Sequence, residues 1–480
     1  MPRSINTSDW KPEFAAHLIR RTSFAATKDE IQKFADMSPQ TAVEHILQPP
    51  KEKVKEEDTG VDFASYFQEK DYFRKFKRSD TKREEIRQKF VKNRNRMTAD
   101  LRGWWLERMR KVRPSALESL TLFWHGHFAT SIRKVKDPYY MFKQNQTFRE
   151  GALGSMVDLA KAVAQDPAMM IYLDVNKSEA SAPNENFARE IFELFLLGEG
   201  NYTEKDIGEA ARAFAGYRIN QNGKVIFRKK FADPGRKTIF GKTRRWEAED
   251  VVDLAFEQPA CARFLAKRLW EYYAGVSASP EDLEKMASSL RSKKFNTSAW
   301  LQEIFLSKGF YSPEVMARQI KSPVQWLVGS CISLGRPLPP VNQANLMIRQ
   351  QGQELFAPPN VRGWVGGRSW INSATLSARY TGSRKMIYGF NRKKRAMKQA
   401  GSMQMAEGRK EKVVKFDMID GSSIFKTLDQ ISKLLLAQPA DARLEGELYE
   451  KYANAPLPVS NKIKCEIAHR IMAAPEYQLI

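Results

Sequence analysis

Cysteine and histidine are scarce in this sequence, and long apolar runs are missing from it. Cys261, Cys331 and Cys465 are the only cysteines among 480 residues, and they lie far apart. This spacing excludes a disulfide scaffold and a zinc site built on closely paired cysteines. No apolar run reaches about 18 residues, so we predict no transmembrane helix.

Several sequence motifs are also absent. The chain has no GxxxxGK[ST] loop, no GxGxxG after an expected strand, no GxSxG turn and no HExxH pair. These absences argue against the common forms of nucleotide hydrolysis, dinucleotide redox chemistry and serine-hydrolase chemistry. The first residues contain no apolar segment of the kind found in secretory signals. We therefore expect a cytoplasmic protein, with the periplasm as the alternative.

Positive charge is in clear excess. The chain has 79 Lys and Arg against 56 Asp and Glu, a formal net charge of +23 at pH 7. This balance suggests an anionic polymer or surface as partner, although a solubilising surface explains it equally well. Much of the excess lies in 69–96 and in 384–415, where eleven Lys and Arg face two Glu. We expect both segments to be exposed and to attract polyanions.

Helical periodicity predicts a mainly α, multi-helix globular domain with a small inserted antiparallel β-sheet. Apolar residues recur at helical spacing through most of the chain. Short β-like runs separated by Asn-Gly and Asp-Pro-Gly turns predict the sheet at about 217–247. We expect N-terminal helices in 1–50, a charged inserted segment in 51–99, a main helical domain in 100–382, a basic linker or arm in 383–415, and C-terminal helices packing on the main domain in 416–480.

Two of the five histidines lie close together inside an apolar run. His125 and His127 flank Gly126 in the stretch FWHGHF. Positions i and i+2 do not share a face of a regular helix, but a glycine between them can loosen it. The pair is either a metal-ligand or acid/base pair, or two core histidines that each make one hydrogen bond.

A polar stripe runs through the apolar segment NENFAREIFELFLLG, residues 184–198. Asn186, Arg189, Glu190 and Glu193 form the stripe at i, i+3, i+4 and i+7. Asn184, just before it, is a candidate binding residue, and Glu185, Arg189, Glu190 and Glu193 are candidate catalytic residues. Glu193 has only apolar neighbours, and a buried carboxylate needs an arginine, a metal or strong hydrogen-bond donors. Glu185 and Arg189 have the i, i+4 spacing of an ion pair. The stripe is either catalytic or an internal Arg–Glu network that holds helices together.

A loop rich in proline, glycine and tryptophan follows at 357–380. Its polar and aromatic candidates for ligand binding are Asn360, Arg362, Trp364, Arg368 and Asn372. Such loops often line pockets, where tryptophan offers a stacking surface and arginine and asparagine fix orientation. A purely structural loop, with glycines permitting tight turns, is an equal interpretation.

Taken in order, five stretches of the chain resemble the bacterial family catalogued as domain of unknown function 1800. They are AAHLIRRTSFAAT, LTLFWHGHFATS, PNENFAREIFELFLLGEGNYTEKDIGEAARAFAGYRI, IKSPVQWLVGS and PPNVRGWVGGRSWINSATLSAR. The resemblance implies a sulfatase-like partner protein from a neighbouring uncharacterised family, because members of the two are often encoded side by side. It assigns no reaction and no catalytic residue, and the basic segments 69–96 and 384–415 lie outside its motifs.

The sequence leads to two hypotheses of different classes. The first is an enzyme or enzyme subunit with acid/base or metal-assisted chemistry, whose pocket joins the histidine pair, the stripe at 185–193 and the loop at 358–372. Here His125, His127 and Glu190 are the candidate ligands of a divalent metal. The alternative is a non-catalytic protein that binds an anionic polymer or a protein partner. Convergence of the three segments on one cleft favours the first hypothesis, and a contiguous basic surface favours the second.

Overall fold

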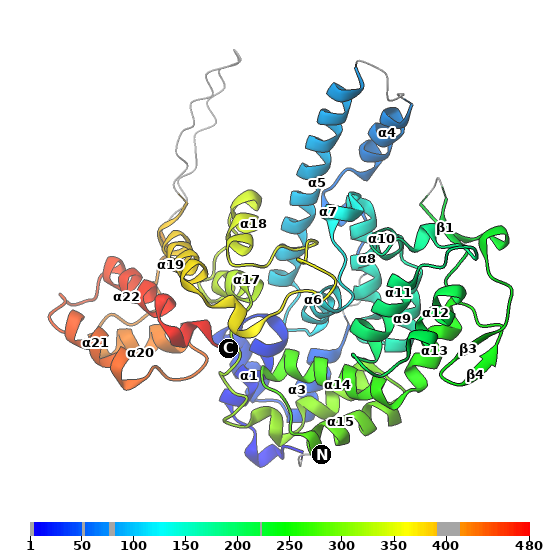
Figure 1. Ribbon diagram of the computed structural model, residues 1–480. Helices are drawn as coiled ribbons and strands as arrows, with labels where there is room; N and C mark the ends of the chain where they lie inside the picture. The colour runs from blue at the N-terminus through cyan, green and yellow to red at the C-terminus, as the bar shows by residue number, and fades with distance from the viewer. Residues whose placement is uncertain (1–3, 50–52, 76–81, 221–222, 391–412) are drawn as a thin grey trace.

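The computed structural model describes residues 4–49, 53–75, 82–220, 223–390 and 413–480, and they form a mainly α protein (Figure 1). The predicted fold class is therefore confirmed. The first half contains α1 (Pro12–Ser23), α2 (Lys28–Ala35), α3 (Pro39–Leu47), α4 (Phe63–Arg74), α5 (Arg83–Lys111), α6 (Leu117–His127), α7 (Ile132–Val135), α8 (Pro138–Gly151), α9 (Met156–Ala164), α10 (Pro167–Tyr172), α11 (Glu185–Glu190), the π-helical turn η4 (Ile191–Leu196) and α12 (Glu204–Ala213).

The second half is helical as well. It contains α13 (Ala248–Glu257), α14 (Pro259–Ala274), α15 (Pro280–Ser292), α16 (Thr297–Phe305), α17 (Pro323–Ser333), α18 (Val341–Gln350), α19 (Ser373–Tyr388), α20 (Ile424–Leu435), α21 (Ala442–Tyr452) and α22 (Asn461–Ala473). In the part of the chain that the structure describes, no helix is both long and apolar enough to span a bilayer.

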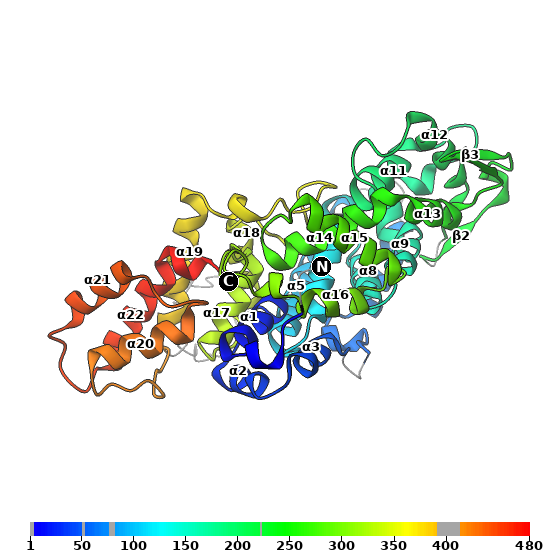
Figure 2. The same cartoon turned by 90° about the horizontal axis from the view of Figure 1, so that it is seen from below.

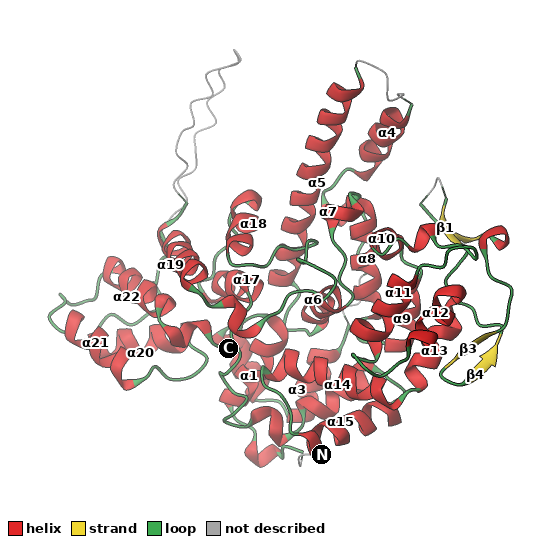
Figure 3. Cartoon of the chain, in the orientation of Figure 1, coloured by secondary structure: helices red, strands yellow, loops and turns green. Residues whose placement is uncertain are grey.

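The predicted β insertion is present as two separate hairpins. Strand β1 (Tyr217–Ile219) pairs antiparallel with β2 (Val225–Phe227), and β3 (Lys237–Ile239) pairs antiparallel with β4 (Lys242–Arg244). Figure 3 shows both hairpins at one end of the molecule, with β3–β4 beside α12. They lie far from the loop at 357–372.

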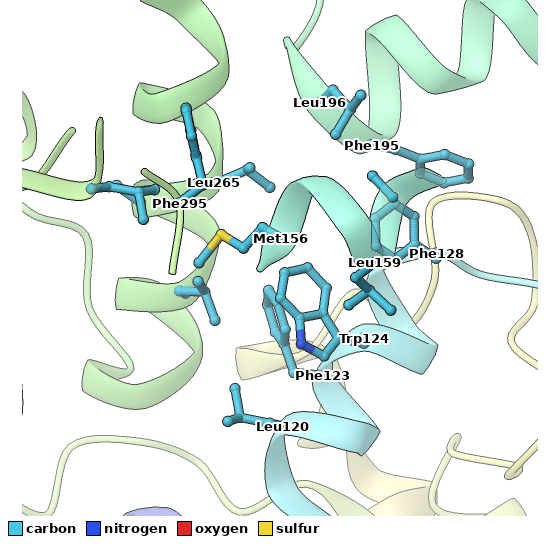
Figure 4. Close-up of a cluster of buried hydrophobic side chains, with 14 of the residues drawn as sticks. Leu120, Phe123, Trp124, Phe128, Met156, Leu159, Phe195, Leu196, Leu265 and Phe295 are labelled. Carbon is cyan, nitrogen blue, oxygen red and sulfur yellow. The ribbon is translucent and has the colours of Figure 1, made fainter. Parts of the chain in front are cut away.

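Two hydrophobic cores hold the helices together. The first takes side chains from α1, α3, α6, α9 and α11–α16, and the second takes them from α5 and α17–α22. Figure 4 shows the centre of the first core, where Trp124 of α6 lies beside Leu159 of α9, and Phe128 at the end of α6 lies beside Phe195 of η4. Because α6 also places Leu122 in the second core, this helix lies where the two cores meet.

The molecule is elongated, with α20–α22 at one end and the hairpins at the other (Figure 2). Helices α4 and α5 account for much of the described part of the predicted charged segment, and α5 continues beyond it to Lys111. The two helices pack against each other. The first half of α5 projects with α4 from the body (Figure 1). Most of the basic linker predicted at 383–415 lies outside the described residues. At its start, α19 runs to Tyr388 and buries Met386 and Ile387 in the second core.

Candidate functional site

The three segments singled out in the sequence meet around α6. A Cβ on Gly363 would lie only 2.0 Å from the carbonyl oxygen of Gly126, so the loop backbone lies directly on the helix. This approach needs glycine, and Gly363 also has a φ of +78°. Arg362 of the same loop lies 3.6 Å from the Glu193 carboxylate on η4. Loop, helix and polar stripe are therefore neighbours.

His125 is completely buried in an aromatic environment. The ring centroids of Trp105, Phe148, Phe356 and Trp364 all lie 5.3–5.9 Å from the centroid of the His125 imidazole. Neither ring nitrogen has a hydrogen-bond partner among the described residues. Burial lowers the pKa of His125 to about 3, so the imidazole is neutral at physiological pH.

His127 points to the other side of α6 and has a structural partner. Its Nε2–H donates to the carbonyl oxygen of Phe195 at 2.8 Å. That carbonyl lies in the last turn of a helix, where backbone acceptors lack partners within the helix. Burial lowers the pKa of His127 to about 3, and the nearby Arg268 guanidinium contributes to this shift. His127 thus corresponds to the core histidine considered in the sequence.

The carboxylates of the stripe are bound by other groups. Glu193 accepts a 2.5 Å hydrogen bond from the Tyr202 hydroxyl, in addition to its ion pair with Arg362. Glu190 is partly buried, and both burial and the neighbouring Glu193 raise its pKa. No hydrogen bond or ion pair in the described residues joins Glu190 or Glu193 to either histidine.

The predicted metal-ligand set is not supported by this arrangement. Among the described residues, no group of three His, Cys, Asp or Glu side chains is close enough to hold an ion. His125 faces aromatic rings, His127 bonds to a main-chain carbonyl, and Glu190 lies beside Glu193. The physical reason is that the two histidines leave α6 in different directions, each into a tightly packed core.

Asn184 and Arg189 have structural roles, whereas the side chains of Glu185 and Asn186 are exposed. Asn184 caps α11 by accepting from the backbone of Asn186, and its amide donates to the Leu173 carbonyl at 2.8 Å. Arg189 pairs with Glu204 through two contacts of 2.7 and 2.6 Å. The ion pair predicted with Glu185 is therefore replaced by one across two helices.

The loop candidates divide into two groups. Asn360 accepts from the Arg362 backbone at 2.9 Å, and Asn372 caps α19 by accepting from Thr375 at 3.0 Å, so both amides shape the backbone. Trp364 and Arg368, in contrast, line a cleft. The cleft is thus the place where the predicted pocket-lining role of this loop has a structural counterpart.

The cleft has a volume of about 510 Å³ and lies between the loop, α6, α14 and the segment before α17. Its polar and aromatic walls are formed by Phe123, Arg268, Glu271, Tyr272, Arg318, Gln319, Ser322, Gln325, Gln353, Trp364, Arg368 and Trp370. A cleft of this size accommodates a small organic molecule or a short segment of a polymer. Neither histidine lines it, although Gly126 between them does.

Three arginines and one glutamate give the cleft a positive balance. Arg268 is partly buried, its Nε–H has no acceptor, and it forms no ion pair with a described residue. Burial lowers its pKa, and Glu271 counteracts part of that effect. The Arg368 side chain is exposed and also has no hydrogen bond or ion pair within the described ranges. The Arg318 side chain donates a 3.4 Å hydrogen bond to the Pro313 carbonyl.

Sequence reasoning missed the wall contributed by α14 and by residues 318–325. Arg268 occurs in the amphipathic stretch ARFLAKRLW, where an arginine looks like an ordinary surface residue. No local spacing distinguishes it from Arg263, which forms an exposed ion pair with Glu284. Only the packing of α14 beside α6 brings Arg268 to the cleft.

Comparison with known proteins gives one match. A family model described as "Protein of unknown function (DUF1800)" matches residues 17–479, nearly the whole chain, and the chain therefore belongs to this family. No curated protein and no solved structure matches it.

Proposed function

We propose that this member of a family of unknown function binds an anionic ligand in the cleft between α6, α14 and the loop at 364–370. The observation that carries the proposal is Arg268, a partly buried guanidinium with an unused N–H and no ion pair to a described residue. A partly desolvated arginine gains most from a carboxylate, phosphate or sulfate group, which it binds through charge-assisted hydrogen bonds. Arg368 and Arg318 add two further cations at the same cleft.

The other walls favour an anionic sugar as the ligand. Tyr272, Trp364 and Trp370 supply aromatic surface, and Gln319, Gln325 and Gln353 supply amides. Aromatic side chains with a few polar groups that fix orientation are typical of small-molecule sites. A sulfate ester would also fit the sulfatase-like partner implied by the family resemblance. The ligand class we propose is therefore a sulfated or carboxylated saccharide, either free or as part of an anionic polymer.

An enzymatic role is the second candidate, and Glu190 is the observation that favours it. The raised pKa of this partly buried carboxyl group is what a general acid needs, and the adjacent Glu193 is held by Tyr202 and Arg362. The two carboxylates would then be the acid/base pair, at a position beside the cleft, since neither of them lines it. Burial of both imidazoles argues against a direct proton-transfer role for His125 and His127 in this conformation.

Isothermal titration calorimetry with a heparin-derived disaccharide tests the binding proposal. We expect saturable binding by the wild type, and at least about tenfold weaker binding by Arg268→Gln and Arg368→Gln, since loss of a charge-assisted hydrogen bond costs about 1.5–3 kcal/mol. Arg245→Gln is the matched control, because Arg245 is an exposed arginine beyond β4 and outside the cleft. Equal affinities for all four proteins would refute the proposal.

The enzymatic candidate needs a different readout. Glu190→Gln and Glu193→Gln should leave disaccharide binding unchanged and abolish any turnover of a sulfated oligosaccharide, measured by chromatography of the products. Turnover that persists in both variants would remove the carboxylates from the reaction.

A further inference from the structure

Four cationic side chains lie around residues 319–321, in the segment before α17, where Arg21 donates to the Gln319 side chain and Arg379 to the Lys321 carbonyl. Arg20 and Arg21 come from α1, and Arg379 comes from α19. Lys321 lies two residues before the start of α17. Arg21 is 2% exposed, Arg379 1% and Lys321 7%. Residues 319–321 are held in place by antiparallel pairing with the last residues of the chain, since Lys321 N–H donates to Gln478 and Ile480 N–H donates to Gln319, both at 2.8 Å.

These cations bond only to neutral groups. Arg379 donates to the Gln478 side chain at 3.0 Å and to the Lys321 carbonyl at 2.8 Å. Arg21 donates to the Gln319 side chain and to main-chain carbonyls. The Lys321 amine lies 3.7 Å from the centroid of the Tyr477 ring and makes no hydrogen bond to a described residue.

Acidic partners are missing from this cluster. Within the described ranges, none of the four cations forms an ion pair, and the Nε–H groups of Arg21 and Arg379 have no acceptor. Burial lowers the pKa of Lys321, and the positive charges of Arg20 and Arg379 lower it further. Buried charges in proteins are normally paired, because an unpaired one costs several kcal/mol. The cluster therefore has both the charge and the free donors of an incomplete site.

We propose that Lys321, Arg379 and the arginines of α1 bind a small inorganic anion, chloride or an oxyanion such as sulfate. The anion would accept from the Lys321 amine and from the unused Nε–H of Arg379, and its charge would balance the cluster. It would also connect α1 with α19 and the C-terminal segment, so its expected effect is on stability. This site does not depend on the proposed function, because it uses none of the cleft arginines.

Unfolding temperatures of the full chain at constant ionic strength test this site. Chloride and sulfate are titrated separately against gluconate, an organic anion too bulky for a closed site. In the wild type, we expect the midpoint to rise in a saturable manner with chloride, sulfate or both, as for a ligand that binds only the folded state. The separate titrations show which anion the site prefers.

The test variant is Lys321→Met, which removes the amine but keeps its length and apolar stem. We expect at least about tenfold weaker apparent anion affinity in this variant, with a midpoint in gluconate equal to or above that of the wild type, since replacing a buried charge by an apolar group is often stabilising. Arg245→Met, at an exposed position, should respond to anions as the wild type does. Identical anion dependence in Lys321→Met and the wild type would overturn the proposal.

Bromide in crystals of the wild-type protein gives a second readout that does not depend on a variant folding. We expect an anomalous peak within hydrogen-bonding distance of Lys321 Nζ and Arg379 Nε. Absence of a peak at this place, with bromide ordered elsewhere in the same crystal, would show that the cluster is stabilised by a neutral Lys321 and holds no anion.

Discussion

Glu118 shows how one buried carboxylate organises three helices. It lies on α6 at 1% exposure and accepts from Arg108 of α5 and Arg149 of α8, both at 2.8 Å, and from Trp105 at 2.9 Å. Burial alone would raise its pKa, but the two arginines outweigh burial and lower the pKa to about 2. The group therefore stays ionised in the folded protein.

Glu118→Gln should be among the most destabilising single substitutions in this chain. The change leaves two guanidinium groups without their carboxylate, and breaking a buried ion pair costs about 3–5 kcal/mol. Urea unfolding at pH 7 measures this loss. Glu107→Gln is the control, because Glu107 pairs with Arg110 at a more exposed position, where we expect a cost below about 1 kcal/mol. Similar losses for the two variants would contradict the account.

Asp166 makes the stability of the folded protein depend on pH. Its carboxyl group accepts from Gln144 at 2.7 Å and from the Met169 backbone at 2.9 Å, and it pairs with no cation among the described residues. Burial raises its pKa to about 7. The folded state therefore keeps a proton that the unfolded state releases between about pH 4 and pH 7. Stability should fall as the pH rises through this window, by up to about 1.4 kcal/mol per pH unit.

Asp166→Asn isolates this effect. The amide oxygen can still cap α10, but the group no longer titrates, so the stability difference between wild type and variant should change steadily from pH 4.5 to pH 7.5. Urea unfolding across this range provides the measurement. A difference that is constant with pH would show that Asp166 is ionised in the folded protein.

At the scale of elements, the helices follow from local signals and the special turns do not. Thr27 accepts from the Glu30 backbone and Thr203 from the Asp206 backbone, which are the capping boxes that the sequence spacing indicates. The π-helical turn η4 has no such signal. There the Leu197 N–H bonds to Phe192, five residues back, and the choice between this and an ordinary turn depends on tertiary packing.

Gly363→Ala should displace the cleft loop while leaving the helices intact. A Cβ at this position would meet the Gly126 carbonyl, so the loop must move away from α6 and carry Trp364 and Arg368 with it. We expect disaccharide affinity to fall at least about tenfold, a loss of about 1.4 kcal/mol. Calorimetry measures the affinity, and circular dichroism should show unchanged helix content.

Gly241→Ala is the matched control for this substitution. Gly241 has almost the same φ, +77°, but a Cβ there would meet nothing within 4 Å. Both variants carry the strain of a positive φ, about 1–2 kcal/mol, so a difference in ligand affinity reports on the loop. Equal affinities for the two variants would show that the Gly126 contact does not position the cleft.

At the scale of the whole molecule, the sequence predicted which segments meet but not what they form. The apolar setting of His125 correctly indicated burial, whereas Glu193 is only partly buried, and both lie next to the loop at 362–364. The expected metal-ligand set is not assembled among the described residues, because α6 stays a regular helix through Gly126 and positions i and i+2 then point apart. Arg268 reaches the cleft through contacts between helices distant in sequence, which no local pattern encodes.

Deleting 391–412 should leave the stability nearly unchanged and weaken polyanion binding. A larger deletion from residue 386 would remove Met386 and Ile387 from the core, so the cut must begin later. The Val414 N–H donates to the Ile387 carbonyl at 2.9 Å, and a short linker can therefore join the cut ends. The deletion removes eight Lys and Arg and two Glu. Retention on heparin across a salt series should decrease, and identical elution would contradict the prediction.

A crystal structure with a bound heparin-derived disaccharide tests the central claim most directly, because it shows where the anion lies. We predict a sulfate or carboxylate group within hydrogen-bonding distance of Arg268, a second contact to Arg368, and a sugar ring beside Trp364. A disaccharide that is fully ordered on another surface, with the cleft empty in the same crystal, would contradict the account.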